Sequence, residues 1–290
     1  MSGIILIGLV ILCAILYGVL AALARPADRH PFFNRERVLA IAHRGGGGLW
    51  PENTMYAFAH AVELGVDVIE MDVHSTQDGE IVVIHDDTVD RTTNGTGRVQ
   101  ELTLAQLKQL DAGYIWTPDN GTSFPFRGRG LKVPTLAEVF AAFADMAMNI
   151  EIKQFKPSIV APLSGLIREH NIAAQVLVAS ADTDTLKEFR RVCPQVATSA
   201  GEQETRFFYT MHLARLGRLC KAPAHAFQVP QYSDGRQVVT PSFVKVAHGR
   251  NMEVHVWTIN DAEDMRRLID MGVDGIVTDY PDRLLTVPGR

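Results

Sequence analysis

The chain has 290 residues, of which 47% are hydrophobic and 21% are charged, and this ordinary globular composition excludes fibrous, collagen-like and disordered proteins. Its 28 basic and 33 acidic residues give a formal net charge of −5, whereas nucleic-acid binders usually carry a basic surplus, so we expect no nucleic-acid partner. The 3 cysteines form no CxxC or CxxH pattern, which argues against a disulfide scaffold and against a cysteine zinc site.

A charge-free apolar run, Ile4–Ala24, lies at the N-terminus. About 21 residues at ~1.5 Å per residue span about 31 Å, which matches the hydrocarbon core of a bilayer. A cleaved signal peptide is one alternative, because Ala22-Leu23-Ala24 fits a cleavage site, but no Lys or Arg precedes the run. A buried helix of a soluble protein is the other. We expect a membrane anchor over residues 1–24, followed by a linker over 25–37.

The charges that flank this run predict its orientation. The basic residues that follow it are Arg25, Arg29, Arg35 and Arg37. Only the N-terminal amine is basic on the other side, so the positive-inside rule predicts a single-pass protein whose remaining chain lies on the cytoplasmic face.

Short apolar runs recur along the rest of the chain, and several are near-continuous in Val, Ile and Ala, as strands buried on both faces are. These runs are Val38–Ala42, Val66–Val73, Ile81–Ile84, Met148–Ile152, Gln175–Ala179, Val196–Thr198, Ala226–Val229, Glu253–Trp257 and Gly275–Thr278. Helical patterns separate most of them, over Thr54–Leu64, Thr135–Ala144, Pro157–His170, Asp182–Arg191, Glu202–Leu216, Pro241–Arg250 and Asp261–Met271. This alternation predicts a parallel sheet with crossover helices, either a closed eight-stranded barrel or an open doubly wound sheet.

Two features make the expected barrel irregular. The link between Val66–Val73 and Ile81–Ile84 is too short for a helical crossover and contains the turn signal Asp78-Gly79, so one run can lie outside the ring. The stretch 86–133 is rich in Gly, Thr, Asn, Asp and Pro, and we expect it to pass over one face of the barrel, because long loops in compact domains tend to be functional. Residues 38–290 then form one domain.

Polar side chains follow the first two strands, where ligands collect in folds of this kind. His43-Arg44 ends the first strand, and the glycines that follow would let backbone approach a ligand closely. Glu70 and Asp72, near the end of the second strand, share one face and repel each other unless a cation lies between them. Such hard oxygen ligands suit Mg²⁺ or Ca²⁺, and Mn²⁺ less selectively.

Three more strands end in polar or aromatic side chains, which we expect at the same end of the barrel. They carry His85-Asp86, Glu151 with Lys153, and Trp257. Each group alone has a structural explanation, as a satisfied histidine, an ion pair or a core aromatic. Together, two histidines, three carboxylates and two basic residues suit cleavage of a phosphate ester, because cations offset charge on the phosphoryl oxygens and imidazoles accept and donate protons near neutral pH.

Eight segments of the chain resemble motifs of the glycerophosphodiester phosphodiesterase family. They are His43-Arg-Gly, Pro51-Glu-Asn-Thr, Glu70-Met-Asp-Val, His85-Asp-Asp-Thr-Val-Asp-Arg-Thr-Thr-Asn-Gly-Thr-Gly97, Pro134-Thr-Leu-Ala-Glu138, Glu151-Ile-Lys153, Val256-Trp-Thr-Ile-Asn260 and Gly272-Val-Asp-Gly-Ile-Val-Thr-Asp279. The resemblance covers about residues 38–286. It implies an irregular (β/α)8 TIM barrel that binds one divalent cation.

The resemblance also implies roles for individual residues. By family role, Glu70, Asp72 and Glu151 match the metal ligands, and His43 and His85 match the acid–base pair. We expect His43 to be the base and His85 the acid, and the reverse assignment stays open.

Four further residues correspond to family positions around the substrate. Arg44 and Lys153 match residues that contact phosphate, Glu52 supports them, and Trp257 lines the substrate pocket. The stretch 86–133 matches the segment that the family inserts over the barrel mouth.

The implied reaction is hydrolysis of a glycerophosphodiester to an alcohol and glycerol 3-phosphate. Some membrane-tethered relatives instead convert lysophospholipids to lysophosphatidic acid, and the anchor together with Gln228-Val-Pro230 makes this chain look like that subgroup. One alternative is a different barrel metallohydrolase, although amidohydrolases need His-x-His where this chain has His43-Arg44. The other is a catalytically silent, membrane-bound barrel that binds a phospholipid or phosphosugar. Head-group preference, metal identity and oligomeric state stay open.

Overall fold

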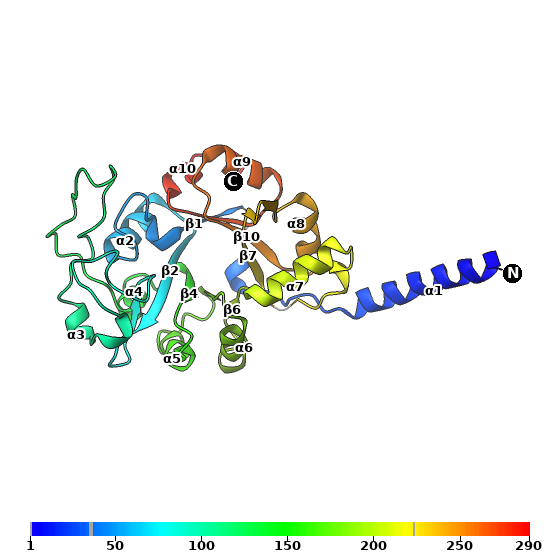
Figure 1. Ribbon diagram of the computed structural model, residues 1–290, viewed down its shortest axis with the longest axis horizontal. Coiled ribbons are helices and arrows are strands. Elements are labelled where there is room, and N and C mark those ends of the chain that lie inside the picture. The colour runs from blue at the N-terminus through cyan, green and yellow to red at the C-terminus, as the bar shows by residue number, and fades with distance from the viewer. Residues whose placement is uncertain (1, 35–36, 223) are drawn as a thin grey trace.

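The computed structural model describes residues 2–34, 37–222 and 224–290. Within them, parallel strands form a nearly closed barrel in the order β6-β5-β4-β2-β1-β11-β10-β7 (Figure 1). The eight strands are β1 (Leu39–Ala42), β2 (Val68–Ser75), β4 (Ala147–Ile152), β5 (Val176–Ala179), β6 (Ala197–Thr198), β7 (Ala226–Pro230), β10 (Glu253–Trp257) and β11 (Gly275–Thr278). A single bridge between Ser199 and Ala226 joins β6 to β7. The barrel is therefore confirmed, and the open sheet is excluded.

Helices follow the strands and cover the barrel wall. They are α2 (Met55–Leu64), α4 (Leu136–Ala142), α5 (Val160–Glu169), α6 (Thr183–Val192), α7 (Glu202–Leu213), α8 (Pro241–His248), α9 (Ala262–Asp270) and α10 (Pro281–Leu285). The first seven confirm the predicted helices, whereas the short α10 was not predicted. In α2, the Thr54 hydroxyl caps the N-terminus by accepting from the Ala57 amide, and Gly65 ends the helix with a φ of 86°.

The additional apolar run is β3 (Ile81–Val83), which pairs antiparallel with β2 and lies outside the ring, as predicted. The stretch 86–133 packs on this strand and contains η3 (Val99–Glu101) and α3 (Leu104–Leu107). It has a small core of its own, formed by Val82, Ile84, Val89, Val99, Leu107, Ala112 and Val133. This excursion is therefore an ordered unit beside the barrel mouth.

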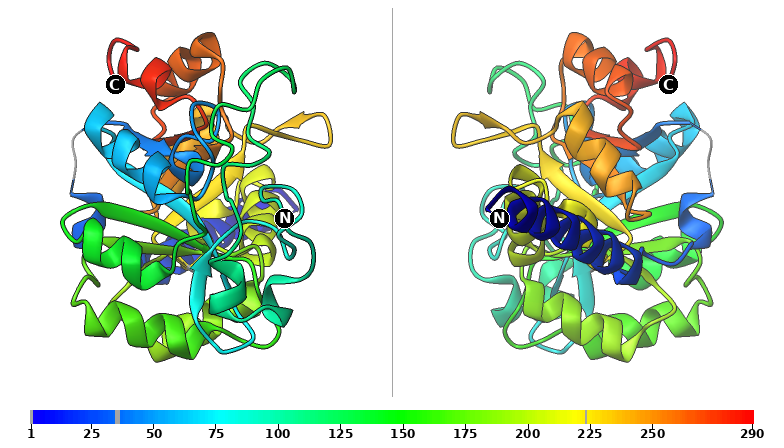
Figure 2. Two further views of the ribbon diagram at one scale, coloured as in Figure 1. Left: turned by 90° about the vertical axis from the view of Figure 1, so that its left-hand side faces the viewer. Right: turned by 90° about the vertical axis from the view of Figure 1, so that its right-hand side faces the viewer.

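A short hairpin that the sequence analysis did not predict follows β7. It consists of β8 (Tyr232–Ser233) and β9 (Arg236–Gln237), and it projects from the barrel in Figure 2. The Tyr209 hydroxyl of α7 donates to the Gln237 carbonyl at 3.4 Å, which ties the hairpin to that helix.

The segment before β1 closes the bottom of the barrel. In η1 (Pro31–Phe33), Phe32 is 4% exposed and belongs to a buried cluster with Leu39, Val68 and Ala147, which begin β1, β2 and β4. The ring of Phe33 stacks on His225, with 6.1 Å between ring centroids. Burial, together with nearby His30 and Arg190, lowers the pKa of His225 to about 4.

We expect His225 to make the fold acid-sensitive. Its depressed pKa keeps the folded state neutral where the unfolded chain binds a proton, so stability is full above pH ~6.5 and declines as the pH falls toward 4. The maximum effect is about 3 kcal/mol, and the real one is smaller because the ring is partly solvated. Urea unfolding at pH 7 and pH 4.5 should show a smaller difference for His225→Gln than for wild type. His170→Gln, directly after α5, is the control and should behave like wild type. An equal difference in stability between the two pH values in all three proteins would contradict the assignment to His225.

The N-terminal helix α1 (Ser2–Leu23) extends away from the barrel, opposite the excursion (Figure 1). Its apolar segment Ile5–Leu23 is 0% buried, so it is not a buried core helix. The helix is long and apolar enough to cross a membrane, and a signal sequence would meet the same criteria. Of the predicted flanking charges, Arg35 lies outside the described residues.

Candidate active site

The site residues that the sequence predicted meet at the carboxyl ends of the strands. A cavity of about 1060 Å³ opens there. Its lining includes His43, Arg44, Glu70, His85, Glu151, Lys153 and Trp257. The remaining two, Asp72 and Glu52, contact the guanidinium of Arg44. The structure therefore brings all nine predicted positions to one place.

Three carboxylates form the centre of the site. One oxygen atom from each of Glu70, Asp72 and Glu151 lies within 4.8 Å of the others. The parallel register places Asp72 directly beside Glu151 on neighbouring strands. Glu70 points to the same face of β2 as Asp72, because side chains two residues apart on a strand share a face. Glu70 and Asp72 are only 3% and 1% exposed. Within the described residues this donor set fits a hard divalent cation.

The electrostatics of the cluster support that fit. Burial, with the charges of Asp72 and Glu151 nearby, raises the pKa of Glu70 to about 8, although the Arg44 amide donates to it at 2.7 Å. Burial also opposes ionisation of Asp72, but Lys153 and Arg44 lower the pKa of that carboxyl. A dication bound among the three would favour the ionised form of Glu70, which this protein otherwise disfavours at neutral pH.

Two basic side chains lie against the carboxylates. The Lys153 ammonium is 2.9 Å from Glu151 Oε1 and 3.3 Å from Asp72 Oδ1. The Arg44 guanidinium is 3.4 Å from Asp72 Oδ2, and Arg44 adopts a left-handed backbone with a φ of 52°. Because Arg44 and Lys153 also line the cavity, they can contact an anion there.

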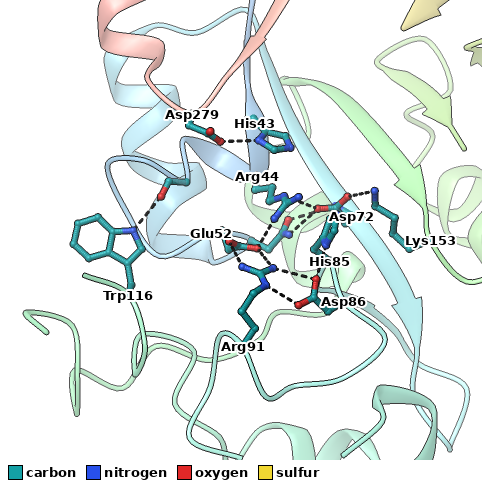
Figure 3. Close-up of polar contacts among 12 residues, drawn as sticks. His43, Arg44, Glu52, Asp72, His85, Asp86, Arg91, Trp116, Lys153 and Asp279 are labelled. Carbon is teal, nitrogen blue, oxygen red and sulfur yellow. Dashed lines mark hydrogen bonds and ion pairs between the residues drawn. The ribbon is translucent and has the colours of Figure 1, made fainter. Parts of the chain in front are cut away.

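A chain of charges links the excursion to His85 (Figure 3). The Arg91 guanidinium donates to both oxygens of Glu52 at 2.8 and 2.7 Å and to Asp86 Oδ2 at 2.6 Å. Asp86 Oδ1 is 2.6 Å from Nδ1 of His85. Although burial opposes it, hydrogen bonds from Arg91 and His85 lower the pKa of Asp86 to about 2. An ionised Asp86 fixes the ring of His85 and leaves Nε2 free to act.

The other histidine has a carboxylate partner as well. His43 Nδ1 lies 2.6 Å from Asp279 Oδ1, and the Asn260 amide donates to Asp279 Oδ2 at 2.7 Å. Burial lowers the pKa of His43, but Asp279 and Glu70 outweigh it and the net shift is upward. Asp279 was not predicted as a site residue, although it directly follows β11 and the strand-end rule could have identified it.

Removing the carboxylate of Asp279 should change the pH profile of the enzyme. We expect Asp279→Asn to lower kcat by about 10–100-fold and to move the limb of kcat/KM that reports His43 to lower pH, because the shift that raises its pKa is lost. Asp274→Asn is the matched control, since Asp274 pairs with His248 at 2.8 Å away from the cavity. A lower rate with an unmoved limb would mean that Asp279 only stabilises the fold.

Two of the glycines after Arg44 are explained by packing. An added Cβ would lie 2.9 Å from the side chain of Ala57 at Gly45 and 2.6 Å from the ring of Tyr280 at Gly48. These close contacts are made with the protein itself, so packing accounts for glycine at these two positions.

Comparisons with known proteins agree with this geometry. The model of the glycerophosphoryl diester phosphodiesterase family matches residues 43–283. A glycerophosphodiester phosphodiesterase from Caldanaerobacter subterraneus is 37% identical over 256 residues, which cover 87% of this chain and 98% of that protein. Lysophospholipase D GDPD1 from Mus musculus is 26% identical over 91% of this chain and 88% of its own length.

A solved structure of a phosphodiesterase is also similar to this chain. A phosphodiesterase from Oleispira antarctica, determined in complex with the product sn-glycerol-3-phosphate, superposes with a TM-score of 0.71 at 25% identity. The match covers 89% of this chain and 99% of that one.

Proposed function

Given that the chain belongs to the glycerophosphoryl diester phosphodiesterase family, we propose that it hydrolyses glycerophosphodiesters to an alcohol and glycerol 3-phosphate at the cavity that His43 and His85 line. The observation that carries this proposal is the convergence of two histidine–carboxylate pairs and a three-carboxylate cluster on one cavity. Glu70, Asp72 and Glu151 would hold Mg²⁺ or Ca²⁺, and when bound, the ion would supply positive charge beside the phosphoryl oxygens.

The residues of the chain supply the remaining chemistry. Arg44 and Lys153 bind and orient the phosphoryl oxygens. His43 accepts a proton from the attacking water, whose oxygen bonds to phosphorus, and the bond from phosphorus to the leaving alcohol breaks. His85 gives its proton to the departing oxygen, so charge and protons balance over the step. Asp279 and Asp86 hold the two rings in place.

We propose that the substrates include lysophospholipids. The cavity continues from the phosphate site toward Tyr209 and Leu213 on α7, Val238 beside the hairpin, and Trp257, which is 43% exposed. These apolar side chains lie among polar ones such as Glu202 and Arg206, and they can cover part of an acyl chain. The relative named lysophospholipase D supports this substrate class.

A single apolar position can separate the two substrate classes. We expect Leu213→Asp to lower kcat/KM for 1-oleoyl-lysophosphatidylcholine at least about tenfold, because a carboxylate replaces apolar surface where the chain would lie. Hydrolysis of glycerophosphocholine should stay within about twofold, since the phosphate site is untouched. Leu64→Asp on α2, also exposed, is the matched control. Equal loss for both substrates, or none for either, would refute an acyl site on α7.

We also propose that α1 spans the membrane and that the barrel lies on the cytoplasmic face. The helix is apolar and uncovered by the barrel, and basic residues follow it while none precedes it. A C-terminal reporter that is active only in the cytoplasm, on a chain that resists carbonate extraction, would support this topology. Activity only in the periplasm would contradict the orientation, and release of a chain shortened near Ala24 would favour a signal peptide.

A further inference from the structure

Three separate segments that carry basic residues meet at the C-terminal end of α1. Arg25 follows the helix, a second group lies between α7 and β7, and the last follows α8 (Figure 1). We call this set the basic collar, and its members are Arg25, Arg215, Arg218, Lys221 and Arg250. The sequence pattern alone places only the first of them beside the membrane.

Hydrogen bonds hold these segments together. The Arg250 guanidinium donates to the carbonyls of Ala24 and Arg218 at 2.9 and 3.0 Å. The amide of Ala222 donates to the Arg25 carbonyl at 3.2 Å. Within α1, the Tyr17 hydroxyl donates to the Arg215 carbonyl at 3.4 Å, so the turn after α7 lies beside the apolar helix itself.

The charges of the collar are left available to a ligand. The Arg250 guanidinium is hydrogen-bonded to backbone carbonyls, whereas the other four side chains are exposed. In the part of the chain that the structure describes, those four form no ion pair with an acidic side chain. Basic residues elsewhere are often paired, as Arg190 is with Glu204 at 2.7 Å. Cations on adjoining segments repel one another, and an anion beside them would relieve that repulsion.

A groove of about 450 Å³ lies inside the collar. Apolar side chains of α1 and of the turn after α7 form its walls, and two cations stand at its edge. The lining residues are Leu20, Leu23, Ala24, Arg25, Leu219 and Lys221. Leu213, the last residue of α7, and Leu216, in the turn that follows, are 61% and 36% exposed. An apolar wall beneath a cationic rim matches a phospholipid, whose acyl chain and phosphate need those two environments.

We propose that the basic collar binds the head group of an anionic phospholipid at the membrane surface. The inference rests on the proposed membrane anchor, because the groove needs α1 in place. Binding there holds α7 against the lipid, and α7 also lines the substrate cavity through Tyr209 and Leu213. The collar therefore orients the active site toward a bilayer that carries its substrate.

Lipid selectivity of the full chain tests the proposal. Detergent-purified protein is incubated with equimolar dioleoylphosphatidylglycerol and dioleoylphosphatidylcholine, passed over a sizing column, and its bound lipids are quantified by mass spectrometry. We expect at least fivefold enrichment of phosphatidylglycerol on wild type and none on the double variant Arg218→Gln/Lys221→Gln. The conservative variant Arg218→Lys/Lys221→Arg should keep the enrichment. Arg98→Gln/Arg129→Gln, which removes two exposed cations from the excursion at the opposite end of the molecule, should keep it too.

Three results would overturn the proposal. They are equal binding of both lipids by wild type, unchanged enrichment in the collar variant, and loss of enrichment in the excursion variant. Intact mass must show α1 still attached, and a chain that has lost it refutes a site built from Leu20–Arg25. Glycerophosphocholine hydrolysis is measured on the same samples. Selective lipid binding without hydrolysis would refute the proposed enzymatic function but not the proposed lipid site.

Discussion

Replacing His85 by alanine is expected to lower kcat for glycerophosphocholine by about 10³-fold, the size of effect usual for a general acid or base. His43→Ala should cost about as much. The two variants should differ once the leaving group changes. With a p-nitrophenyl ester of glycerol phosphate, the departing phenolate needs little protonation, so His85→Ala should recover most of its activity and His43→Ala should not.

This pair of substrates tests the assigned roles as well as the importance of the residues. His248→Ala is the control, because His248 also pairs with an aspartate but lies on the outer surface. If His43→Ala is the variant that recovers, the base and the acid are exchanged. If both variants keep wild-type activity on glycerophosphocholine, neither imidazole takes part, and the proposed proton transfers are wrong.

Removing the divalent cation should have an effect of similar or larger size. We expect EDTA to lower activity by more than about 10³-fold and Mg²⁺ or Ca²⁺ to restore it, because the cation offsets charge on the phosphoryl oxygens. Asp72→Asn should not be restored by either ion, since one of the three proposed ligands is lost. Glu202→Gln is the matched control, because Glu202 lines the same cavity but lies outside the carboxylate cluster.

A binding measurement separates loss of metal from loss of chemistry. Thermal unfolding of the metal-free chain should shift upward when Mg²⁺ or Ca²⁺ is added, because an ion that binds only the folded state stabilises it. The shift should be absent in Asp72→Asn and present in His85→Ala. Full activity in EDTA, or an equal thermal shift in Asp72→Asn, would contradict the assignment of the three carboxylates as ligands.

Much of this site follows from local sequence patterns. Glu70 and Asp72 lie two residues apart on β2, and Glu151 and Lys153 lie two residues apart at the end of β4, so each pair shares one face. The rule that ligands bind at the carboxyl ends of strands places both pairs at the same end of the barrel. The short link through Asp78-Gly79 was enough to predict that one run leaves the ring, which β3 does. In each case the physical cause lies within a few residues of the chain.

What the sequence did not predict depends on contacts between distant segments. Arg91 lies in an excursion without periodic pattern, and its role appears only when Glu52 and Asp86 come within hydrogen-bond distance. Asp279 reaches His43 because β11, near the C-terminus, pairs with β1, the first strand of the barrel. The basic collar likewise exists only after folding, since its members come from segments that sequence spacing does not relate.

The central claim is that the carboxylate cluster and the two histidines direct water to the phosphorus of a glycerophosphodiester. Phosphorus-31 NMR of glycerophosphocholine turnover in ¹⁸O-labelled water tests it most directly. We predict glycerol 3-phosphate that carries one ¹⁸O on phosphorus, unlabelled choline, and no turnover by Asp72→Asn or by the double variant His43→Ala/His85→Ala. Labelled choline, or wild-type protein that binds the diester with Mg²⁺ or Ca²⁺ present and releases no product, would contradict the claim.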